Sequence, residues 1–367
     1  MRKNDLSDNS EDVVSAYDYD LPEGFIATSP AHPRESAKIL SYSRDDDRTD
    51  IATFADLPGL LPSGSLLVFN RTKVVPAKLS LHKKTGGALR VICLDAKGDL
   101  IRVMSDRKLD VDTSLVSDSG YSFVVERQDG RYFYLRPIDH SGKSVDIGGN
   151  GLYDLLFKIG ETPLPPYIKN SPLPESALRE EYQSVFAEKS GSVAAPTASL
   201  HFTEGLLEDL KKAGHSCVFI TLHVGLGTFA PLTEESMVSG KLHEESYEIP
   251  TETISAIDAA KRDGRPVIAV GTTSVRALES SADDDGHIVH PSGVTDLFIR
   301  EGYRFRIVDG LITNFHVPRS SLLMLVAAFI GRDKIMELYR RAMDEKFRFF
   351  SFGDGMFIYP AGYSSGK

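Results

Sequence analysis

A block of short β-rich runs interrupts a chain whose other parts alternate buried strands with helices. Between Lys73 and about Ile138 these runs are separated by turns such as KTGG, DAKGD and SDSG. Even spacing with Gly and Asp turns predicts a small antiparallel barrel or sandwich. The block follows an early apolar strand at 66–69, and strand–helix alternation resumes after it. We therefore expect it to be an inserted domain.

The second half of the chain predicts an α/β domain with a mainly parallel sheet flanked by helices. CVFITLHV at 217–224 and VIAVG at 267–271 are continuous apolar runs, typical of strands buried on both faces. A helical pattern follows each run, and such alternation favours a parallel sheet. The predicted divisions are a disordered acidic tail at 1–16, the α/β domain at 17–72 and 151–367, and the β-barrel domain at 73–150.

Acidic residues outnumber basic ones, and the excess lies near the N-terminus. Lys and Arg total 42 and Asp and Glu total 52, a net charge of −10, of which residues 1–50 carry −6 (6 basic, 12 acidic). This excludes an indiscriminate nucleic-acid binder, because counterion release needs clustered Lys and Arg. Residues 300–350 hold 10 basic and 6 acidic side chains, which suits either a local polyanion contact or a solvated helix face. The arginines of that segment that could contact a polyanion are Arg300, Arg304, Arg306, Arg319, Arg340, Arg341 and Arg348.

The composition also predicts where the protein works. The longest apolar run, at 322–330, is about half of the ~18 residues that a membrane span needs. The N-terminal residues carry acids and no apolar run, unlike a signal peptide. Cys93 and Cys217 are the two cysteines and cannot form a disulfide framework. We therefore expect a cytoplasmic protein without membrane attachment, and a monomer.

Two histidines stand in loops beside small or hydroxyl residues. AAPTASLHFT places His201 and Thr203 at a loop-to-helix junction, where free backbone N–H groups gather. LHVGLGTF places His223 at the carboxyl end of a buried strand, before Gly225 and Gly227. Ligands of open α/β sheets bind outside that edge. The simpler interpretations are a helix cap with a packed histidine and a tight glycine turn.

Two further motifs combine a strand end with polar side chains. In GTTSVRALES a strand runs into Thr272 and Thr273 and then a helix, which is a plausible anion cradle. Arg276, on the first turn, could hold a carboxylate by two hydrogen bonds, or it could be an ordinary surface arginine. In LITNFHVP, Asn314 and His316 end a strand before a helix.

Other chemistry is weakly supported. Asp354 lies between two glycines, which also describes a simple turn. The chain has neither HExxH nor CxxC, and only His287 and His290 form an HxxH pair, so we expect no metal. There is no GxSxG nucleophile elbow. The residues alone predict a metal-free α/β protein with a polar cleft that contains histidine, and they do not name a reaction.

As an ordered set, however, the motifs resemble one family, the S-adenosylmethionine:tRNA ribosyltransferase-isomerases of queuosine biosynthesis. The resemblance begins at YDYDLPEGFIA and continues through LLVFNRTKVVPAKL, PLPPYIK and EEYQSVFA to the motifs above and RFFSFGDGMFI. It implies a catalytic α/β domain interrupted by a barrel. It also implies that S-adenosylmethionine is a ribosyl donor and that the acceptor is 7-aminomethyl-7-deazaguanine at the wobble position of tRNA. The products would be epoxyqueuosine-tRNA, adenine and methionine.

The resemblance also suggests roles for the candidate residues. The reaction needs a base for a proton of the ribose 5′ carbon and a group that assists the departure of adenine. We expect His223 or His201 as the base, because histidine titrates near neutral pH. Asp354 would face the sulfonium or the methionine ammonium, and Arg276 the carboxylate. The residues expected around the donor are Phe202 or Phe229 stacked on adenine, with Thr203, Gly225, Gly227, Thr228, Thr272, Thr273, Asn314 and His316.

Two segments depart from the family pattern. The run 70–73, Asn-Arg-Thr-Lys, stands where the family has Asn-Asp-Thr-Arg, and the run 104–106, Met-Ser-Asp, replaces Arg-Pro-Gly/Ala in the barrel. Two alternatives to the transferase therefore stay open. One is a non-catalytic tRNA- or nucleotide-binding paralogue, and the other is the same donor chemistry on a different acceptor. The retained His201, His223, Arg276 and Asp354 favour an enzyme.

Overall fold

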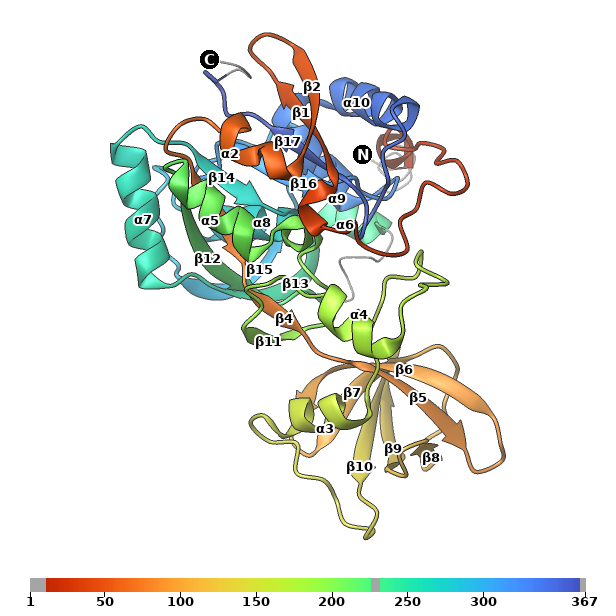
Figure 1. The fold of residues 1–367 in the computed structure, drawn as a ribbon. Coiled ribbons are helices and arrows are strands. Elements are labelled where there is room, and N and C mark those ends of the chain that lie inside the picture. The colour runs from red at the N-terminus through yellow and green to blue at the C-terminus, as the bar shows by residue number, and fades with distance from the viewer. Residues whose placement is uncertain (1–10, 226–231, 364–367) are drawn as a thin grey trace, which may run out of the picture.

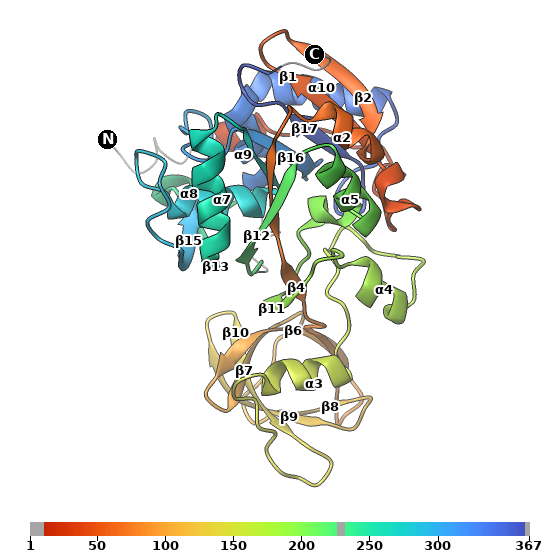
Figure 2. The same cartoon turned by 60° about the vertical axis from the view of Figure 1, so that its left-hand side comes forward.

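The computed structural model describes residues 11–225 and 232–363 (Figure 1). A larger α/β domain lies above a smaller barrel, and two short strands connect them (Figures 1 and 2). These strands are β4 (Thr72–Val74) and β11 (Lys189–Ser192), which pair in parallel. The predicted α/β fold with an inserted barrel is confirmed.

The sheet of the large domain has nine strands in the order β15-β13-β12-β3-β14-β16-β17-β1-β2. Its centre, β12-β3-β14-β16, is parallel. The pairs β12–β13, β13–β15, β16–β17 and β1–β2 are antiparallel, so the sheet is mixed and the prediction of a mainly parallel sheet needs correction. Apolar runs identify buried strands but not the direction of edge strands. The strands are β1 (Lys38–Ser43), β2 (Arg48–Thr53), β3 (Leu66–Asn70), β12 (Ser216–Leu222), β13 (Lys241–Glu248), β14 (Val267–Val270), β15 (Ser292–Leu297), β16 (Gly310–Asn314) and β17 (Gly355–Ile358).

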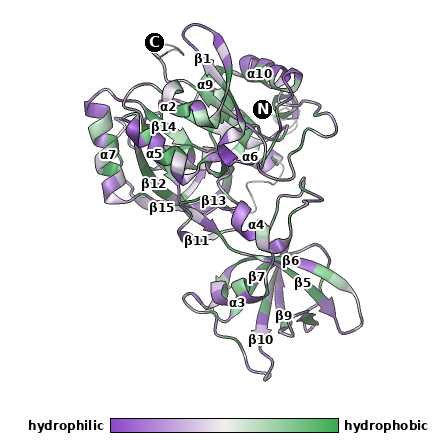
Figure 3. Cartoon of the chain, viewed as in Figure 1, coloured by the Kyte–Doolittle hydropathy of each residue, from purple (hydrophilic) through white to green (hydrophobic). Residues whose placement is uncertain are grey.

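Helices cover both faces of this sheet. Apolar side chains of α2 and α5 pack in one core cluster, and those of α7, α8, α9 and α10 pack in another. Thr203 caps α5 as predicted, since its Oγ1 accepts a hydrogen bond of 3.2 Å from the Leu206 N–H. Helix α7 shows both hydrophobic and hydrophilic residues along its length (Figure 3). The helices are α2 (Leu57–Leu60), α4 (Glu175–Glu181), α5 (Glu204–Lys212), α6 (Glu234–Ser239), α7 (Thr251–Arg262), α8 (Thr272–Ser281), α9 (Ser321–Ile330) and α10 (Arg332–Asp344).

The inserted domain is a closed barrel with strand order β10-β7-β6-β5-β8-β9. Buried and exposed residues alternate along its strands, as a one-sided core requires. Helix α3 (Gly151–Ile159) places Leu152, Leu155 and Leu156 in the same core, beyond the predicted boundary at residue 150. The barrel strands are β5 (Lys78–Lys83), β6 (Ala88–Lys97), β7 (Leu100–Ser105), β8 (Ser114–Ser117), β9 (Ser122–Asp129) and β10 (Tyr132–Ile138).

The expected N-terminal tail is described only from residue 11 onward. Residues 11–15 are helical, and Val14 and Tyr17 pack in the core of the large domain. The described part of the predicted tail is therefore ordered. In the ranges 11–225 and 232–363, no helix combines the length and the apolar character that crossing a bilayer requires.

Candidate active site

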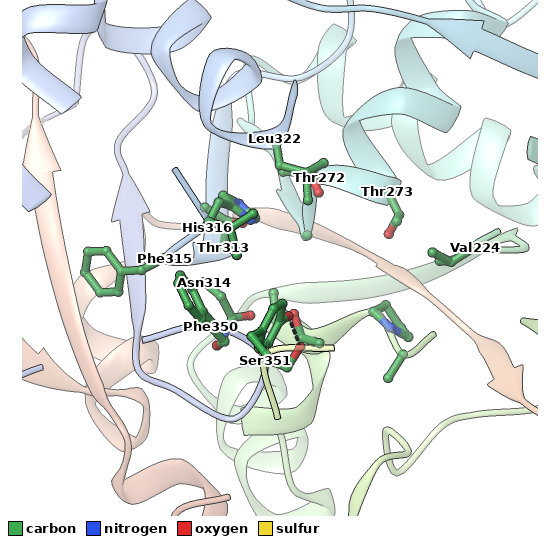
Figure 4. A pocket seen from close by; sticks show the side chains of 17 residues that line it. Val224, Thr272, Thr273, Thr313, Asn314, Phe315, His316, Leu322, Phe350 and Ser351 are labelled. Atoms are coloured by element: carbon green, nitrogen blue, oxygen red, sulfur yellow. Dashed lines mark hydrogen bonds between the residues drawn. The ribbon is translucent and has the colours of Figure 1, made fainter. Parts of the chain in front are cut away.

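A pocket opens at the carboxyl ends of β14 and β16, the edge at which ligands bind in α/β sheets. We call it the central pocket; it encloses about 620 Å³, its open mouth included. Thr272 and Thr273 lie on one side, and Phe350 and Ser351 lie on the other (Figure 4). The other lining residues are Tyr167, Ala195, Pro196, Thr197, Ala198, Val224, Gly271, Thr313, Asn314, Phe315, His316, Val317 and Leu322.

The strand-to-helix turn after β14 forms one wall of the central pocket. Gly271 has φ of +89°, a conformation that favours glycine, and it allows the chain to turn directly from β14 into α8. The first N–H groups of α8 lack a side-chain cap, so they and the hydroxyls of Thr272 and Thr273 suit an anionic or hydroxyl-bearing ligand. The structure thus places these two threonines where the sequence predicts them.

Asn314 and His316 line the wall formed by the end of β16. The Asn314 Nδ2 donates to the Phe350 carbonyl at 3.2 Å and lies 3.3 Å from the His201 Nε2. Its Oδ1 is buried and has no hydrogen-bond partner among the described residues. A buried carbonyl oxygen of this kind is normally hydrogen-bonded, so this atom is an exception in the wall of the pocket.

His316 is fixed by hydrogen bonds and is neutral. Its Nε2 lies 2.9 Å from the Thr313 Oγ1, and its backbone N–H donates to the Tyr339 hydroxyl at 2.8 Å. Burial lowers the pKa of His316 to about 3. The ring can therefore offer a hydrogen bond to a ligand but carries no charge at neutral pH.

Tyr167 and Ser351 are pocket residues to which the sequence analysis assigned no role. Their hydroxyl oxygens lie 2.7 Å apart, and the Tyr167 ring lies 4.8 Å from the Phe350 ring. Tyr167 belongs to the proline-rich run PLPPYIK. The likeness of this run to the family was the only sequence signal that could have indicated a place for Tyr167 in the pocket.

A second cavity lies between the two domains, and we call it the interdomain cleft. It encloses about 1560 Å³ including its open side, and Val224 lines both this cleft and the central pocket. The barrel supplies Leu94, Asp95, Arg102, Met104, Arg131 and Tyr132, and α3 supplies Tyr153. The large domain and β11 supply Gly191, Val193, His223, Gly225, Leu242, His243, Glu244, Glu245 and Ser246.

His223 lines the interdomain cleft and is held by the strands that connect the domains. Its Nδ1 lies 2.8 Å from the Thr72 Oγ1, which also contacts the Ser192 Oγ at 3.0 Å. A Cβ at Gly191, whose φ is +150°, would lie 2.8 Å from ring atoms of His223, so only glycine fits beneath this ring. Burial lowers the pKa of His223, and Glu248 opposes the shift.

Asn70 connects the two cavities. Its Nδ2 donates to the Leu222 carbonyl at 2.9 Å and to the Thr273 Oγ1 at 3.2 Å. Its Oδ1 accepts from the N–H groups of Leu222 at 3.0 Å and Thr72 at 3.1 Å. All four hydrogen-bonding positions of the amide are thus used. Arg71, which lies between Asn70 and Thr72 in the sequence, pairs with Glu188 at 3.1 Å. The departure from the family pattern at Arg71 therefore leaves this hydrogen-bond network intact.

Arg276 lies on α8, as expected, but it does not line the central pocket. Its guanidinium is buried, forms an ion pair with Glu245 of β13, and donates from Nε to the Leu297 carbonyl at 3.2 Å. The other oxygen of Glu245, Oε1, accepts from the Gly225 N–H at 2.9 Å. In this structure Arg276 neutralises an acid of a distant strand, which local sequence could not reveal, and the carboxylate clamp stays a prediction.

Three other candidates occupy structural positions outside the central pocket. The Asp354 carboxylate accepts from the backbone N–H groups of Lys38 at 3.1 Å and Arg348 at 2.7 Å, which fastens a turn. Phe202 is fully buried, with its ring 4.8 Å from that of Phe69, so it does not suit the expected stacking on adenine. Thr203 is a helix cap. Gly227, Thr228 and Phe229 lie outside the described residues.

His201 is also in the core. Its ring stacks on Phe54 at 4.0 Å and lines neither cavity. Burial, followed by the charges of Arg348 and Arg34, lowers the pKa of His201 to about 3. Of the two histidines considered as the base, only His223 faces a cavity.

We expect the buried His201 to make the fold sensitive to acid. Its pKa is about 3 in the folded protein and about 6.5 when exposed, so below pH 6.5 the unfolded chain binds a proton that the folded chain does not. Stability is then lost as the pH falls from 6.5 towards 3, by about 1.4 kcal/mol per pH unit for this group. Denaturant unfolding between pH 7 and 4 measures the slope. A His201→Phe variant should show a shallower slope, and an equal slope would contradict this assignment.

No group of three or more His, Cys, Asp or Glu side chains that could bind a metal occurs in the part of the chain that the structure describes. His287 of the HxxH pair is exposed and lies 3.7 Å from Asp283.

The fold and both cavities define a class: a two-domain α/β enzyme in which a pocket at the sheet edge adjoins a cleft shared with an inserted barrel. A family described as "Queuosine biosynthesis protein" matches residues 14–358. This chain is 42% identical to the S-adenosylmethionine:tRNA ribosyltransferase-isomerase of Desulforamulus reducens and 43% identical to that of Aquifex aeolicus. Each match covers 94% of this chain and 99% of the relative. The chain therefore belongs to the S-adenosylmethionine:tRNA ribosyltransferase-isomerase family of queuosine biosynthesis.

A solved structure supports the same membership. The crystal structure of the S-adenosylmethionine tRNA ribosyltransferase from Thermotoga maritima is 31% identical and has a TM-score of 0.52. The match covers 94% of this chain and 100% of that one. The family resemblance predicted from the motifs is confirmed, and the chain is an enzyme of this family.

Proposed function

We propose that this enzyme transfers the ribosyl group of S-adenosylmethionine to 7-aminomethyl-7-deazaguanine at the wobble position of tRNA and isomerises it. The products are epoxyqueuosine-tRNA, adenine and methionine. The observation that carries this proposal is the family match over residues 14–358 of a chain in which a small-molecule pocket adjoins an open cleft.

We assign the donor to the central pocket. Its lining combines aromatic and apolar side chains with a few hydroxyl and amide groups, as the sites of small molecules do. Tyr167 and Phe350 offer aromatic surface for adenine, and the start of α8 offers N–H groups and hydroxyls for the ribose or the methionine carboxylate. Asn314 and His316 complete the wall beside the start of α8.

We assign the acceptor nucleotide to the interdomain cleft, because this cavity is open and is lined by both domains. His223 is the proposed base. If its Nδ1–H donates to Thr72, Thr72 can donate to Ser192, and the Nε2 is left unprotonated. This nitrogen would take the proton from the ribose 5′ carbon. The acceptor amine, in its neutral form, then bonds to the ribosyl group as adenine and methionine leave.

The test is to incubate the protein with S-adenosylmethionine and tRNA that carries the aminomethyl precursor. Adenine and methionine should form only with that tRNA, and not with the same tRNA carrying guanine at the wobble position. Binding without product would favour a non-catalytic paralogue. Product formed with a non-tRNA acceptor would favour the same donor chemistry on another substrate.

We expect Gly191→Ala to lower turnover about 10²-fold, because the added Cβ would displace the His223 ring. Thr72→Val should also lower turnover, since it removes the hydroxyl at Nδ1, whereas Thr72→Ser keeps it. Steady-state rates at saturating substrates measure this. Equal rates for Thr72→Val and Thr72→Ser would exclude a role for the hydroxyl in orienting the ring.

We also propose that the enzyme acts as a monomer in the cytoplasm. Cys93 and Cys217 are unpaired, which suits a reducing compartment. Light scattering at working concentration tests the oligomeric state.

A further inference from the structure

The barrel wall of the interdomain cleft carries positive charge that is not neutralised. Arg131 of the turn between β9 and β10 lines the cleft, and Arg127 lies on β9. Within the described ranges, neither forms an ion pair with a carboxylate. The other barrel strand arginines do: Arg90 with Asp106, Arg102 with Asp95, and Arg136 with Asp99 and Glu126.

Aromatic rings position these two guanidinium groups. Arg127 lies 3.7 Å from the centre of the Tyr134 ring. Arg131 lies 5.2 Å from the centre of the Tyr132 ring, and its Nη2 donates to the Tyr132 hydroxyl at 3.1 Å. Such stacking restricts an arginine while leaving N–H groups to bind an anion. Two ordered, uncompensated cations are thus present on one hairpin.

The hairpin is continuous with the cleft. Tyr134 of β10 pairs in register with Arg127 on one side and with Arg102 of β7 on the other. Arg102 lines the cleft and its charge is neutralised by Asp95, with contacts of 3.0 and 2.6 Å. Arg102 therefore adds no free positive charge to this wall, whereas Arg127 and Arg131 do.

The opposite wall of the cleft carries Glu244, and the neighbouring Glu245 is neutralised by Arg276. The proposed acceptor has both charges, since its aminomethyl group binds a proton in water and its backbone phosphates are anions. With Glu244 on one side and two arginines on the barrel hairpin, the cleft suits such a nucleotide in one orientation, with its phosphates towards the barrel.

The segment 300–350, which the sequence singled out, is a weaker candidate. Four of its arginines already pair with carboxylates: Arg306 with Asp284, Arg319 with Glu11, Arg332 with Asp333, and Arg348 with Asp354. None of the arginines of this segment lines the interdomain cleft.

We propose that Arg127 and Arg131 bind backbone phosphates of the tRNA beside the wobble nucleotide. This inference rests on the proposed function, because it takes tRNA as the partner. Guanidinium groups bind phosphate through paired N–H donors, and contacts to phosphate position a nucleic acid without reading its sequence. The hairpin would therefore fix the register of the anticodon loop and leave recognition of the base to the large domain.

The experiment measures the affinity for unmodified tRNA against salt concentration for the wild type and the double variant Arg127→Gln/Arg131→Gln. Each phosphate contact in single-stranded nucleic acid contributes about 0.7 to the slope of log K against log salt. Loss of two contacts should lower the slope by about 1.4. The variant Arg127→Lys/Arg131→Lys keeps the charges and should retain most of the slope.

Arg136→Gln is the matched control, because it removes one arginine charge from the same hairpin. Arg136 lies on the same hairpin, but Asp99 and Glu126 already neutralise it, so the slope should not change. A wild-type slope in the double Gln variant, or an equal loss in the control, would overturn the proposal. Thermal unfolding confirms that each variant is folded. Failure of the proposed function would instead show as absence of adenine release by the wild type, whatever the slopes.

Discussion

We expect His223→Gln to lower turnover by about 10²–10⁴-fold, the usual contribution of a general base. Glutamine keeps a hydrogen-bonding side chain but cannot take up the proton. His223 does not line the central pocket and would meet the donor only at its ribose 5′ carbon, so the affinity for S-adenosylmethionine should change little. The expected result is therefore a change in the maximal rate with a constant donor dissociation constant. Single-turnover release of adenine and equilibrium binding of the donor measure the two quantities.

The matched control is His201→Gln. His201 is buried against Phe54 and lines neither cavity, so this variant should lose stability while the folded fraction keeps its rate. A wild-type rate in His223→Gln, or a complete loss of rate in folded His201→Gln, would show that His223 is not the base.

The pH dependence of turnover gives a second measurement of the same assignment. Burial lowers the pKa of His223 from its usual value of 6.5. The ring is therefore neutral and able to accept a proton at neutral pH, and turnover should fall only when the pH drops through this lowered pKa. The acidic limb is thus expected below pH 6.5 in the wild type. An acidic limb above pH 6.5 would assign it to another group.

Much of the architecture could be predicted from the sequence, because it depends on local patterns. Apolar runs at 217–224 and 267–271 identify central strands, turn residues identify the barrel, and Thr203 caps its helix as expected. These strands also indicate which residues lie at the carboxyl edge of the sheet. Thr272 and Asn314 could therefore be predicted to lie near the pocket that they line. The direction of the edge strands depends on pairing between distant segments, and it was not found.

The roles of individual polar residues were harder to predict, because they depend on distant partners. Asn70 and Thr72 lie in a block that resembles the family but were given no role from sequence, yet they join both cavities. Asp354 and Phe202 stand in motifs that resemble a site, but one fastens a turn and the other fills the core. A motif indicates that a loop is near the site, whereas burial and partners decide what each side chain does.

Substitution of Arg276 has the largest expected effect on stability. Substitution of its ion-pair partner, Glu245, tests the reason for this effect. The side chains of Arg276 and Glu245 are 4% and 2% exposed. Removing one partner of a buried ion pair leaves the other charge uncompensated and costs about 3–5 kcal/mol. We therefore expect both Arg276→Ala and Glu245→Ala to lower the free energy of unfolding by this amount in denaturant titrations at pH 7. Asp333→Ala, which breaks the exposed pair with Arg332, should cost at most about 1 kcal/mol.

The same two variants separate a structural role of Arg276 from the carboxylate clamp first expected of it. A clamp would make donor affinity fall in Arg276→Ala and persist in Glu245→Ala, because only the first variant removes the guanidinium. A structural pair makes the two variants alike in donor affinity when both are measured under conditions where they are folded. We expect them to be alike, since the guanidinium is occupied by Glu245 and by the Leu297 carbonyl at 3.2 Å and does not line the central pocket. A selective loss of affinity in Arg276→Ala would restore the clamp and would require Arg276 to leave Glu245 when the donor binds.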